Sequence, residues 1–198
     1  MRIGLFGGSF DPVHWGHVRP LRAARAELAL DRVIYLPTAV PPHKAHQQEA
    51  SALRRYCMVE LAVLAEEGLE VSDHELTLDR EAYTVETLEH FSRALPEAEL
   101  SLIVGADSLA TLHLWRRWRD LAALARLIVL ARPGWRRAAQ RAAALEAIPD
   151  SGFDVVTAEV VDASSTRIRE LLRHRDVTVA ELLPGPVLDY IRKYRLYE

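Results

Sequence analysis

Two histidines near the amino terminus have the types and spacing that most directly indicate chemistry. His14 and His17 are three positions apart, so on the first turn of a helix they share one face and can converge on one ligand. An apolar run at residues 3–6 and the pair Gly7–Gly8 precede them, which predicts a buried strand, a tight turn and a helix start. Such a turn directs backbone N–H groups and the positive end of a helix dipole into one small space. The segment is therefore a candidate anion site.

The stretch GGSFDPVHWGH resembles the HxGH signature of the nucleotidylyltransferase superfamily, and in particular that of the nicotinate mononucleotide adenylyltransferases. Gly16 is expected to let a ligand approach the backbone closely. Each residue alone has a structural explanation, such as a turn glycine or a capping histidine, but the combination favours a nucleotide site. The resemblance implies ATP-binding roles for Gly7, Gly8, Ser9, Phe10, His14 and His17.

Apolar runs alternate with helical patterns along the rest of the chain, and the runs end in glycine, proline or serine turns. This alternation predicts a parallel sheet in an α/β fold: a Rossmann-like, doubly wound sheet in three α/β/α layers. We expect a single domain over residues 1–198, with a small helical part from about 163 to 198. The further predicted strands are 33–36, 69–72, 100–104, 127–131 and 153–161, and the main helices 14–28, 51–66, 84–95 and 138–148.

The inward face of the helix predicted over 51–66 is assigned from its apolar residues. An apolar stripe at helical spacing is expected to face the core. On that basis the inward residues are Leu53, Tyr56, Cys57, Leu61 and Leu64.

Ligands of such sheets bind beyond the carboxyl ends of the strands, so the residues that follow each strand are candidates. His43 and Lys44 lie in a proline-rich loop after strand 33–36. Of 25 basic residues only Lys44 and Lys193 are lysines, which favours a local role for Lys44. PPHK resembles the family's substrate-phosphate loop, so we interpret Lys44 as a phosphate ligand. For His43 a ligand role and a solvated loop position stay equally open.

Three further strand ends carry candidates. Asp107 follows Gly105, where it either caps a helix or accepts a hydrogen bond from a ribose hydroxyl. Arg132 follows strand 127–131 and is interpreted as a phosphate contact. The resemblance implies that Thr84, in a YT pair, helps to hold a pyridine carboxylate. It also implies that Trp115 stacks on the pyridine ring beside a backbone N–H that reaches the carboxylate. The expected mononucleotide-binding residues are His43, Lys44, Thr84, Trp115, Arg116 and Arg132.

Three hydroxyl residues, Ser164, Ser165 and Thr166, precede the last helical region, together with Arg167. One helix end does not need three capping side chains, so the cluster predicts a second anion site suited to a triphosphate. The stretch resembles the family's SSTxIR motif and departs from it only at Ala163, where isoleucine is usual. Gly105, Asp107, Ser164, Ser165, Thr166 and Arg167 complete the expected ATP site, and His14, His17, Lys44 and Arg167 are the expected catalytic residues.

The composition narrows the class of protein. A net charge of −3 argues against a dedicated nucleic-acid binder, and a single cysteine, Cys57, fits a reducing cytoplasm. We expect no signal peptide and no membrane span. No Walker lysine, nucleophile elbow, carboxylate dyad or metal cluster is recognised, so the site is expected to hold phosphates rather than to supply a nucleophile. Mg²⁺ is expected to be held mainly by the phosphates of ATP.

The predicted function is transfer of the adenylyl group of ATP to nicotinate mononucleotide, both small-molecule substrates. Alternatives are another HxGH enzyme such as phosphopantetheine adenylyltransferase, or a non-catalytic nucleotide sensor. A class I aminoacyl-tRNA synthetase is disfavoured, because the chain is short, acidic and lacks a tRNA-binding region. The preference for the acid or the amide mononucleotide and the formation of a homo-oligomer stay open.

Overall fold

The computed structural model describes residues 1–39, 49–78, 80–131, 153–157 and 161–198. Six strands form one sheet in the order β3-β2-β1-β4-β5-β6, and every neighbouring pair is parallel. The strands are β1 (Arg2–Gly8), β2 (Arg32–Pro37), β3 (Leu69–Val71), β4 (Glu99–Gly105), β5 (Arg126–Ala131) and β6 (Phe153–Thr157). The predicted doubly wound parallel sheet is confirmed, with its topological switch point between β1 and β4.

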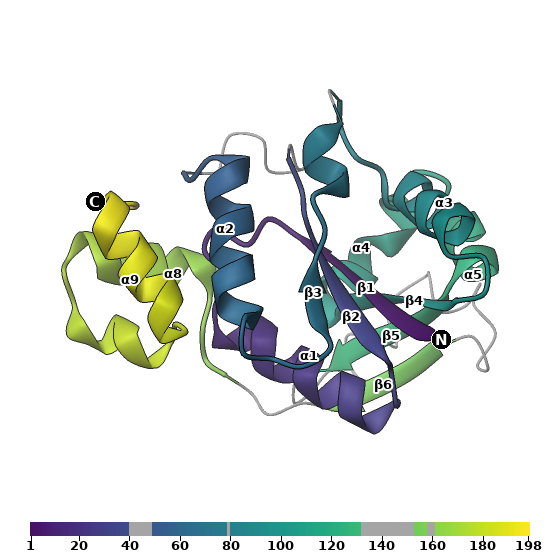
Figure 1. Ribbon diagram of the computed structural model, residues 1–198, viewed down its shortest axis with the longest axis horizontal. Coiled ribbons are helices and arrows are strands. Elements are labelled where there is room, and N and C mark those ends of the chain that lie inside the picture. Colours follow the sequence, from purple (N-terminus) through teal and green to yellow (C-terminus); the bar gives the residue numbers. More distant parts are fainter. Residues whose placement is uncertain (40–48, 79, 132–152, 158–160) are drawn as a thin grey trace.

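Helices cover both faces of the sheet (Figure 1). Within the described ranges they are α1 (Trp15–Glu27), α2 (Ala52–Val63), α3 (Thr84–Ala94), α4 (Ala106–Thr111), α5 (Trp118–Leu124), α8 (Ser165–Arg173) and α9 (Gly185–Tyr194), with short 3-10 turns η1 (His74–Thr77), η2 (Leu112–Leu114) and η4 (Val177–Glu181). The helix predicted over 138–148 lies outside the described residues. None of the described helices has both the length and the apolar character needed to cross a bilayer.

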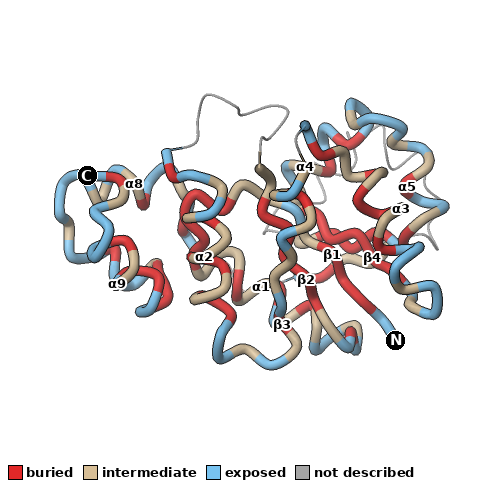
Figure 2. Tube along the Cα trace, turned by 45° about the horizontal axis from the view of Figure 1, so that its top comes forward, coloured by how far each residue is buried: buried red, intermediate tan, exposed pale blue. Residues whose placement is uncertain are grey.

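The central strands contribute to two separate cores, because successive side chains point to opposite faces of the sheet. On β2, Val33 and Tyr35 join the core under α1 and α2, whereas Ile34 and Leu36 join the core under α3 and α5. Figure 2 shows buried residues running along the central strands β1, β2 and β4. The three predicted layers are therefore present.

The inward face of α2 differs from the prediction. Leu53 and Leu64 are 68% and 77% exposed, although both were expected to face the core. The buried positions are Arg55, Met58, Val59, Ala62 and Val63. This set has regular helical spacing and begins with an arginine, so an assignment from apolar residues alone misplaces the stripe.

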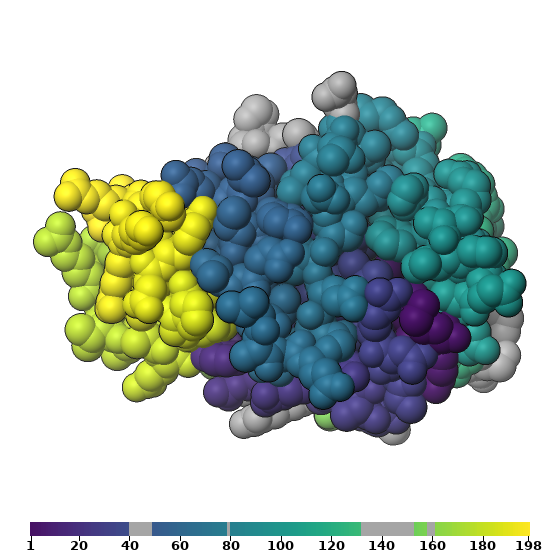
Figure 3. All heavy atoms as spheres, in the orientation of Figure 1, coloured from purple at the N-terminus to yellow at the C-terminus, as the bar shows by residue number. Residues whose placement is uncertain are grey.

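The C-terminal helices pack on the side of the sheet that carries α1 and α2. Side chains of α8 and α9, including Ile168, Val187 and Ile191, belong to the same core as α1. The Trp15 N–H donates to the carbonyl of Leu182 at 3.0 Å. In the space-filling view the C-terminal residues lie directly against α2 (Figure 3). The helical part from about residue 163 therefore rests on the first helices of the sheet domain.

Candidate active site

A cleft of about 910 Å³ opens at the carboxyl ends of the central strands. Its walls include Gly7 and Gly8 at the end of β1, Gly105 at the end of β4 and Ala131 at the end of β5. The cleft therefore lies at the topological switch point, where open parallel sheets bind their ligands.

The glycines at this edge have different physical roles. A Cβ on Gly7 or Gly105 would have no atom within 4 Å, so both backbones face open space that a ligand can approach. A Cβ on Gly8 would lie 2.8 Å from the Phe10 ring. A Cβ on Gly16 would lie 2.9 Å from the His14 ring. Gly16 is thus required by the neighbouring imidazole, which is not the reason that the sequence indicated.

The two predicted histidines lie together at the start of α1 and both line the cleft. Their rings are 3.9 Å apart between centroids. His14 caps the helix: its Nδ1 accepts the Gly16 N–H at 3.1 Å, and His17 Nδ1 accepts the His14 N–H at 3.3 Å. A neutral imidazole that accepts at Nδ1 carries its proton at Nε2. Both rings therefore carry their proton on Nε2, and they lie beside the positive end of the α1 dipole.

The hydroxyl cluster meets this turn. Ser165 Oγ donates to the carbonyl oxygen of Pro12 at 3.0 Å, so its proton is already used within the protein. Ser164 caps α8 by accepting the Arg167 N–H at 3.2 Å, which leaves the Ser164 proton for another acceptor. Thr166 also lines the cleft. The two predicted anion sites are therefore adjacent, and Ser165 joins them instead of presenting a donor to a ligand.

Of the two arginines in this segment, Arg169 lines the cleft, whereas Arg167, the expected catalytic residue, does not. Arg167 is exposed, donates to Asp162 at 2.8 Å and is not among the residues that line the cleft. Arg169 lines the cleft, with Nε 2.9 Å from Glu49 Oε1 and Nη1 2.7 Å from the carbonyl oxygen of Asp11. Residues two apart on a helix point in nearly opposite directions, so only one of the two can face the cleft. The last arginine of the SSTxIR pattern was the signal for Arg169.

The other end of the cleft carries three of the six expected mononucleotide residues. Thr84, the first residue of α3, lines it together with Trp115 and Arg116, and Trp118 does not. The Arg116 guanidinium lies 4.5 Å from the centroid of the Tyr83 ring. A cation over an aromatic face is favourable, so the two side chains form one rim.

A buried carboxylate, Glu75, also lies at this end of the cleft and was not among the predicted site residues. Glu75 lines the cleft and accepts a hydrogen bond from the Thr87 hydroxyl at 2.9 Å. Burial raises the pKa of Glu75, and the hydrogen bonds from Thr87 and Thr38 offset part of this shift.

The remaining candidates divide between the cleft and the undescribed segments. Asp107, in the first turn of α4, is exposed and lines the cleft, as do Ser9 and Phe10. His43, Lys44 and Arg132 lie outside the described residues. Within the described ranges, no group of three or more His, Cys, Asp and Glu side chains could hold a metal ion.

A parallel sheet in this strand order, with its cleft at the switch point and two helix starts beside it, defines a Rossmann-like nucleotide-binding protein. The sequence matches the cytidylyltransferase-like family over residues 5–171, and the chain belongs to that family.

Two curated relatives are called probable nicotinate-nucleotide adenylyltransferase. The one from Shewanella sp. (strain MR-7) is 40% identical over 212 residues, covering 100% of this chain and 99% of the relative. The one from Laribacter hongkongensis (strain HLHK9) is 43% identical, covering 98% and 94%. Nicotinic acid mononucleotide adenylyltransferase from Plasmodium falciparum, solved in complex with NaAD, has the same fold. It superposes with a TM-score of 0.81 at 18% identity over 99% of this chain and 97% of that one.

Proposed function

We propose that this chain transfers the adenylyl group of ATP to nicotinate mononucleotide, which gives nicotinate adenine dinucleotide and pyrophosphate. The main observation in support is the hydrogen bond between Ser165 and Pro12, which joins the two predicted anion-binding segments. The cleft beside them extends to Thr84 and Trp115. Full-length relatives at 40% and 43% identity carry the name of this activity. One end of the cleft suits a triphosphate and the other a flat, aromatic base.

The reaction needs alignment and charge stabilisation more than a protein nucleophile. A phosphate monoester has a second pKa of about 6, so at pH 7 its oxygen is already anionic. That oxygen attacks the α-phosphorus of ATP, a new P–O bond forms, and the bond to the bridging oxygen of the β-phosphate breaks. Pyrophosphate leaves with that electron pair. No general base is required, and donors aimed at the phosphates supply the catalysis.

The donors in this proposal come from the starts of two helices. His14 and His17 donate from Nε2 to the triphosphate, where charge builds up on the leaving group. Ser164, Thr166 and Arg169 hold the outer phosphates. Lys44 remains the proposed phosphate ligand of the mononucleotide, with His43 and Arg132 as further proposed contacts.

The remaining assignments concern the two nucleosides and the metal. Asp107 accepts from a ribose hydroxyl, and Thr84, Trp115 and Arg116 bind the pyridine ring and its carboxylate. We propose that Mg²⁺ arrives with ATP and is held by phosphate oxygens and water, for which hard oxygen ligands are suited. When bound, it neutralises phosphate charge.

The test is a pyrophosphate-release assay with ATP and a panel of acceptors: nicotinate mononucleotide, nicotinamide mononucleotide, phosphopantetheine and no acceptor. The proposal requires pyrophosphate and a dinucleotide product with the nicotinate acceptor. Turnover with phosphopantetheine and with none of the other acceptors would indicate that the chain catalyses a different adenylyl transfer of the superfamily. ATP binding without release of pyrophosphate under any condition would support a nucleotide sensor instead. The ratio between the first two acceptors measures the preference for the acid.

A further inference from the structure

The turn after β1 contains a residue in an unfavourable backbone conformation. Phe10 has φ of 49°, in the left-handed region that residues with a Cβ seldom adopt. Such a conformation is unfavourable for a residue with a Cβ and persists only where the surroundings impose it. Phe10 lies between the glycine turn and His14, inside the segment that binds the triphosphate in the function proposed above.

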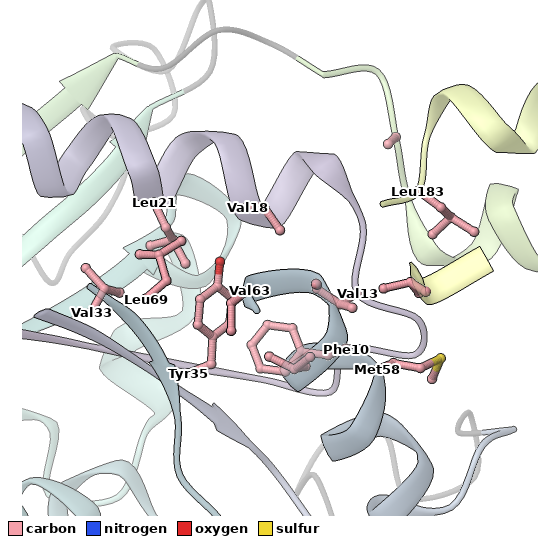
Figure 4. Close-up of a cluster of buried hydrophobic side chains, with 14 of the residues drawn as sticks. Phe10, Val13, Val18, Leu21, Val33, Tyr35, Met58, Val63, Leu69 and Leu183 are labelled. Atoms are coloured by element: carbon pink, nitrogen blue, oxygen red, sulfur yellow. The ribbon is translucent and has the colours of Figure 1, made fainter. Parts of the chain in front are cut away.

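The Phe10 ring links this turn to the second histidine. The ring is 2% exposed and lies in the core beside Tyr35, with centroids 5.5 Å apart (Figure 4). On its other side it meets the His17 ring edge to face, at 5.3 Å and 82°. Gly8 makes room for it, because a Cβ there would lie 2.8 Å from the ring. The position of the Phe10 ring therefore limits where the His17 ring can rest.

Arg55, on α2, holds the residue before Phe10. Its side chain is fully buried, and its guanidinium donates only to backbone carbonyls in the bonds that the structure describes. The acceptors are Ser9 at 2.5 Å, Thr38 at 2.7 Å, Ala39 at 3.2 Å and Ala50 at 3.3 Å. One planar cation thus fixes the glycine turn to the end of β2 and the start of α2.

Tyr197, the penultimate residue, holds the residue after Phe10. Its hydroxyl donates to Asp11 Oδ1 at 2.6 Å. The same buried carboxylate accepts the N–H groups of Glu49 and Ala50 at 2.8 Å and 3.2 Å. The chain is therefore held on both sides of Phe10, by Arg55 at Ser9 and by Tyr197 at Asp11.

The buried guanidinium of Arg55 carries an energetic cost that an apolar side chain would not. Burial lowers the pKa of Arg55, and the charge of the neighbouring Asp11 carboxylate offsets part of this shift. Burying a cation carries a desolvation cost that an apolar side chain of similar volume avoids, and such replacements are often neutral or stabilising. What an apolar side chain cannot do is hold four carbonyl oxygens in fixed directions.

We propose that Arg55 and Tyr197 are positioning residues for adenylyl transfer: together they hold Phe10 in its left-handed conformation and so place the His17 Nε2 donor. The inference rests on the proposed function for its kinetic consequence. Its geometric consequence, the place of the His17 ring, holds in the ligand-free protein as well.

The experiment compares Arg55→Met, Arg55→Lys and Tyr197→Phe with Arg54→Met. Arg54 is the matched control, since it is the preceding residue on α2 and contacts Tyr190 at 3.1 Å instead of the turn. We expect Arg55→Met to lower kcat by roughly 10- to 100-fold, because a misplacement of about 1 Å can cost on the order of 10²-fold. KM for ATP should stay nearly constant, as for a group that acts in the transition state. Arg55→Lys should recover part of kcat, Tyr197→Phe should show a smaller loss, and Arg54→Met none.

The second readout is the Cε1–H signal of His17 in the NMR spectrum of the ligand-free protein, assigned by its absence in His17→Asn. We expect this signal to shift in Arg55→Met and Tyr197→Phe and to stay in place in Arg54→Met. A change in only one of the two readouts, or in neither, overturns the proposal.

Tyr197→Phe removes a single oxygen atom, so it decides the matter if Arg55→Met does not fold. If the wild-type protein releases no pyrophosphate, the proposed function fails, and the NMR signal still tests the placement of His17 by itself. The two failures are therefore distinguishable.

Discussion

The hydroxyl of Ser165 donates a hydrogen bond to the carbonyl oxygen of Pro12 at 3.0 Å, across 153 positions of the sequence. The bond joins the start of α8 to the turn that begins α1. A Cβ on Gly16 would lie 3.6 Å from the carbonyl oxygen of Ala163, so the two helix starts are neighbours. Two helix dipoles consequently present their positive ends near one another, which suits a polyphosphate better than either helix alone.

Substitutions of Ser165 and Thr166 should have different effects, the first on the stability of the fold and the second on ligand binding. Ser165→Ala removes the bond to Pro12 and should lower the free energy of unfolding by about 1 kcal/mol, together with kcat. Thr166→Val removes an exposed hydroxyl at the cleft, so it should change stability by less than about 0.5 kcal/mol and raise KM for ATP. Urea unfolding and steady-state kinetics measure both variants. The opposite pattern would show that Ser165, and not Thr166, contacts the ligand.

His17→Asn should remove the proposed catalytic donor while keeping the fold. Its side-chain oxygen can take the place of Nδ1 and accept the His14 N–H, but nothing replaces Nε2. We expect kcat to fall by roughly 10²- to 10³-fold, as for the loss of one transition-state donor. The melting temperature should hardly change. His113→Asn, at an exposed position outside the cleft, is the matched control and should keep full activity. Near-normal turnover of His17→Asn would exclude the assignment.

The sequence predicted the sheet and the helix starts well, for a physical reason. Buried parallel strands are short apolar runs, and each ends in a residue that cannot continue it, so β1, β2, β4 and β5 were placed to within one or two residues. The convergence of His14, His17 and the Ser164–Thr166 cluster followed from topology, because the strands' carboxyl ends share one edge.

The sequence-based predictions failed where a side chain lies in an environment that is unusual for its type. Buried Arg55 donates to four carbonyl oxygens, three of which belong to segments distant in sequence, and composition gives no hint of them. Without it the buried stripe of α2 was assigned to Leu53 and Leu64. Arg167 and Arg169 are chemically identical, and the rotation of α8 brings only Arg169 to the cleft. In the sequence, only the last position of the SSTxIR pattern pointed to Arg169. The burial of Arg55, by contrast, is tertiary information that no local pattern contains.

Gly16→Ala tests whether this glycine serves His14. The new Cβ would lie 2.9 Å from the His14 ring, so the ring must move and its Nε2 donor is displaced. We expect kcat to fall at least about tenfold. Stability should change little, because alanine also favours the helix by up to about 1 kcal/mol. Gly185→Ala, where a Cβ meets nothing within 4 Å, is the control for the backbone effect. Full activity of Gly16→Ala would show that neither the His14 ring nor ligand access requires a glycine at this position.

Glu75→Gln should stabilise the protein in a pH-dependent way. Since burial raises the pKa of Glu75, the folded state binds this proton more tightly than the unfolded state does. The contribution of Glu75 to stability is therefore fully present below the pKa of the unfolded chain and is lost as the pH rises through the folded pKa. The amide side chain of the variant would stay neutral at every pH and can still accept the Thr87 hydroxyl.

The measurement is the melting temperature of the wild type and of Glu75→Gln between pH 4 and pH 8. The melting temperature of the variant should rise relative to that of the wild type as the pH increases, and the two melting temperatures should converge toward pH 4. Glu97→Gln, on an exposed turn, removes the same charge and corrects for the change in net charge. A pH-independent difference, or a wild type that gains on the variant toward pH 8, would mean that Glu75 is ionised in the folded protein at no cost. In that case the cleft that Glu75, Tyr83 and Arg116 line would carry a fixed negative charge.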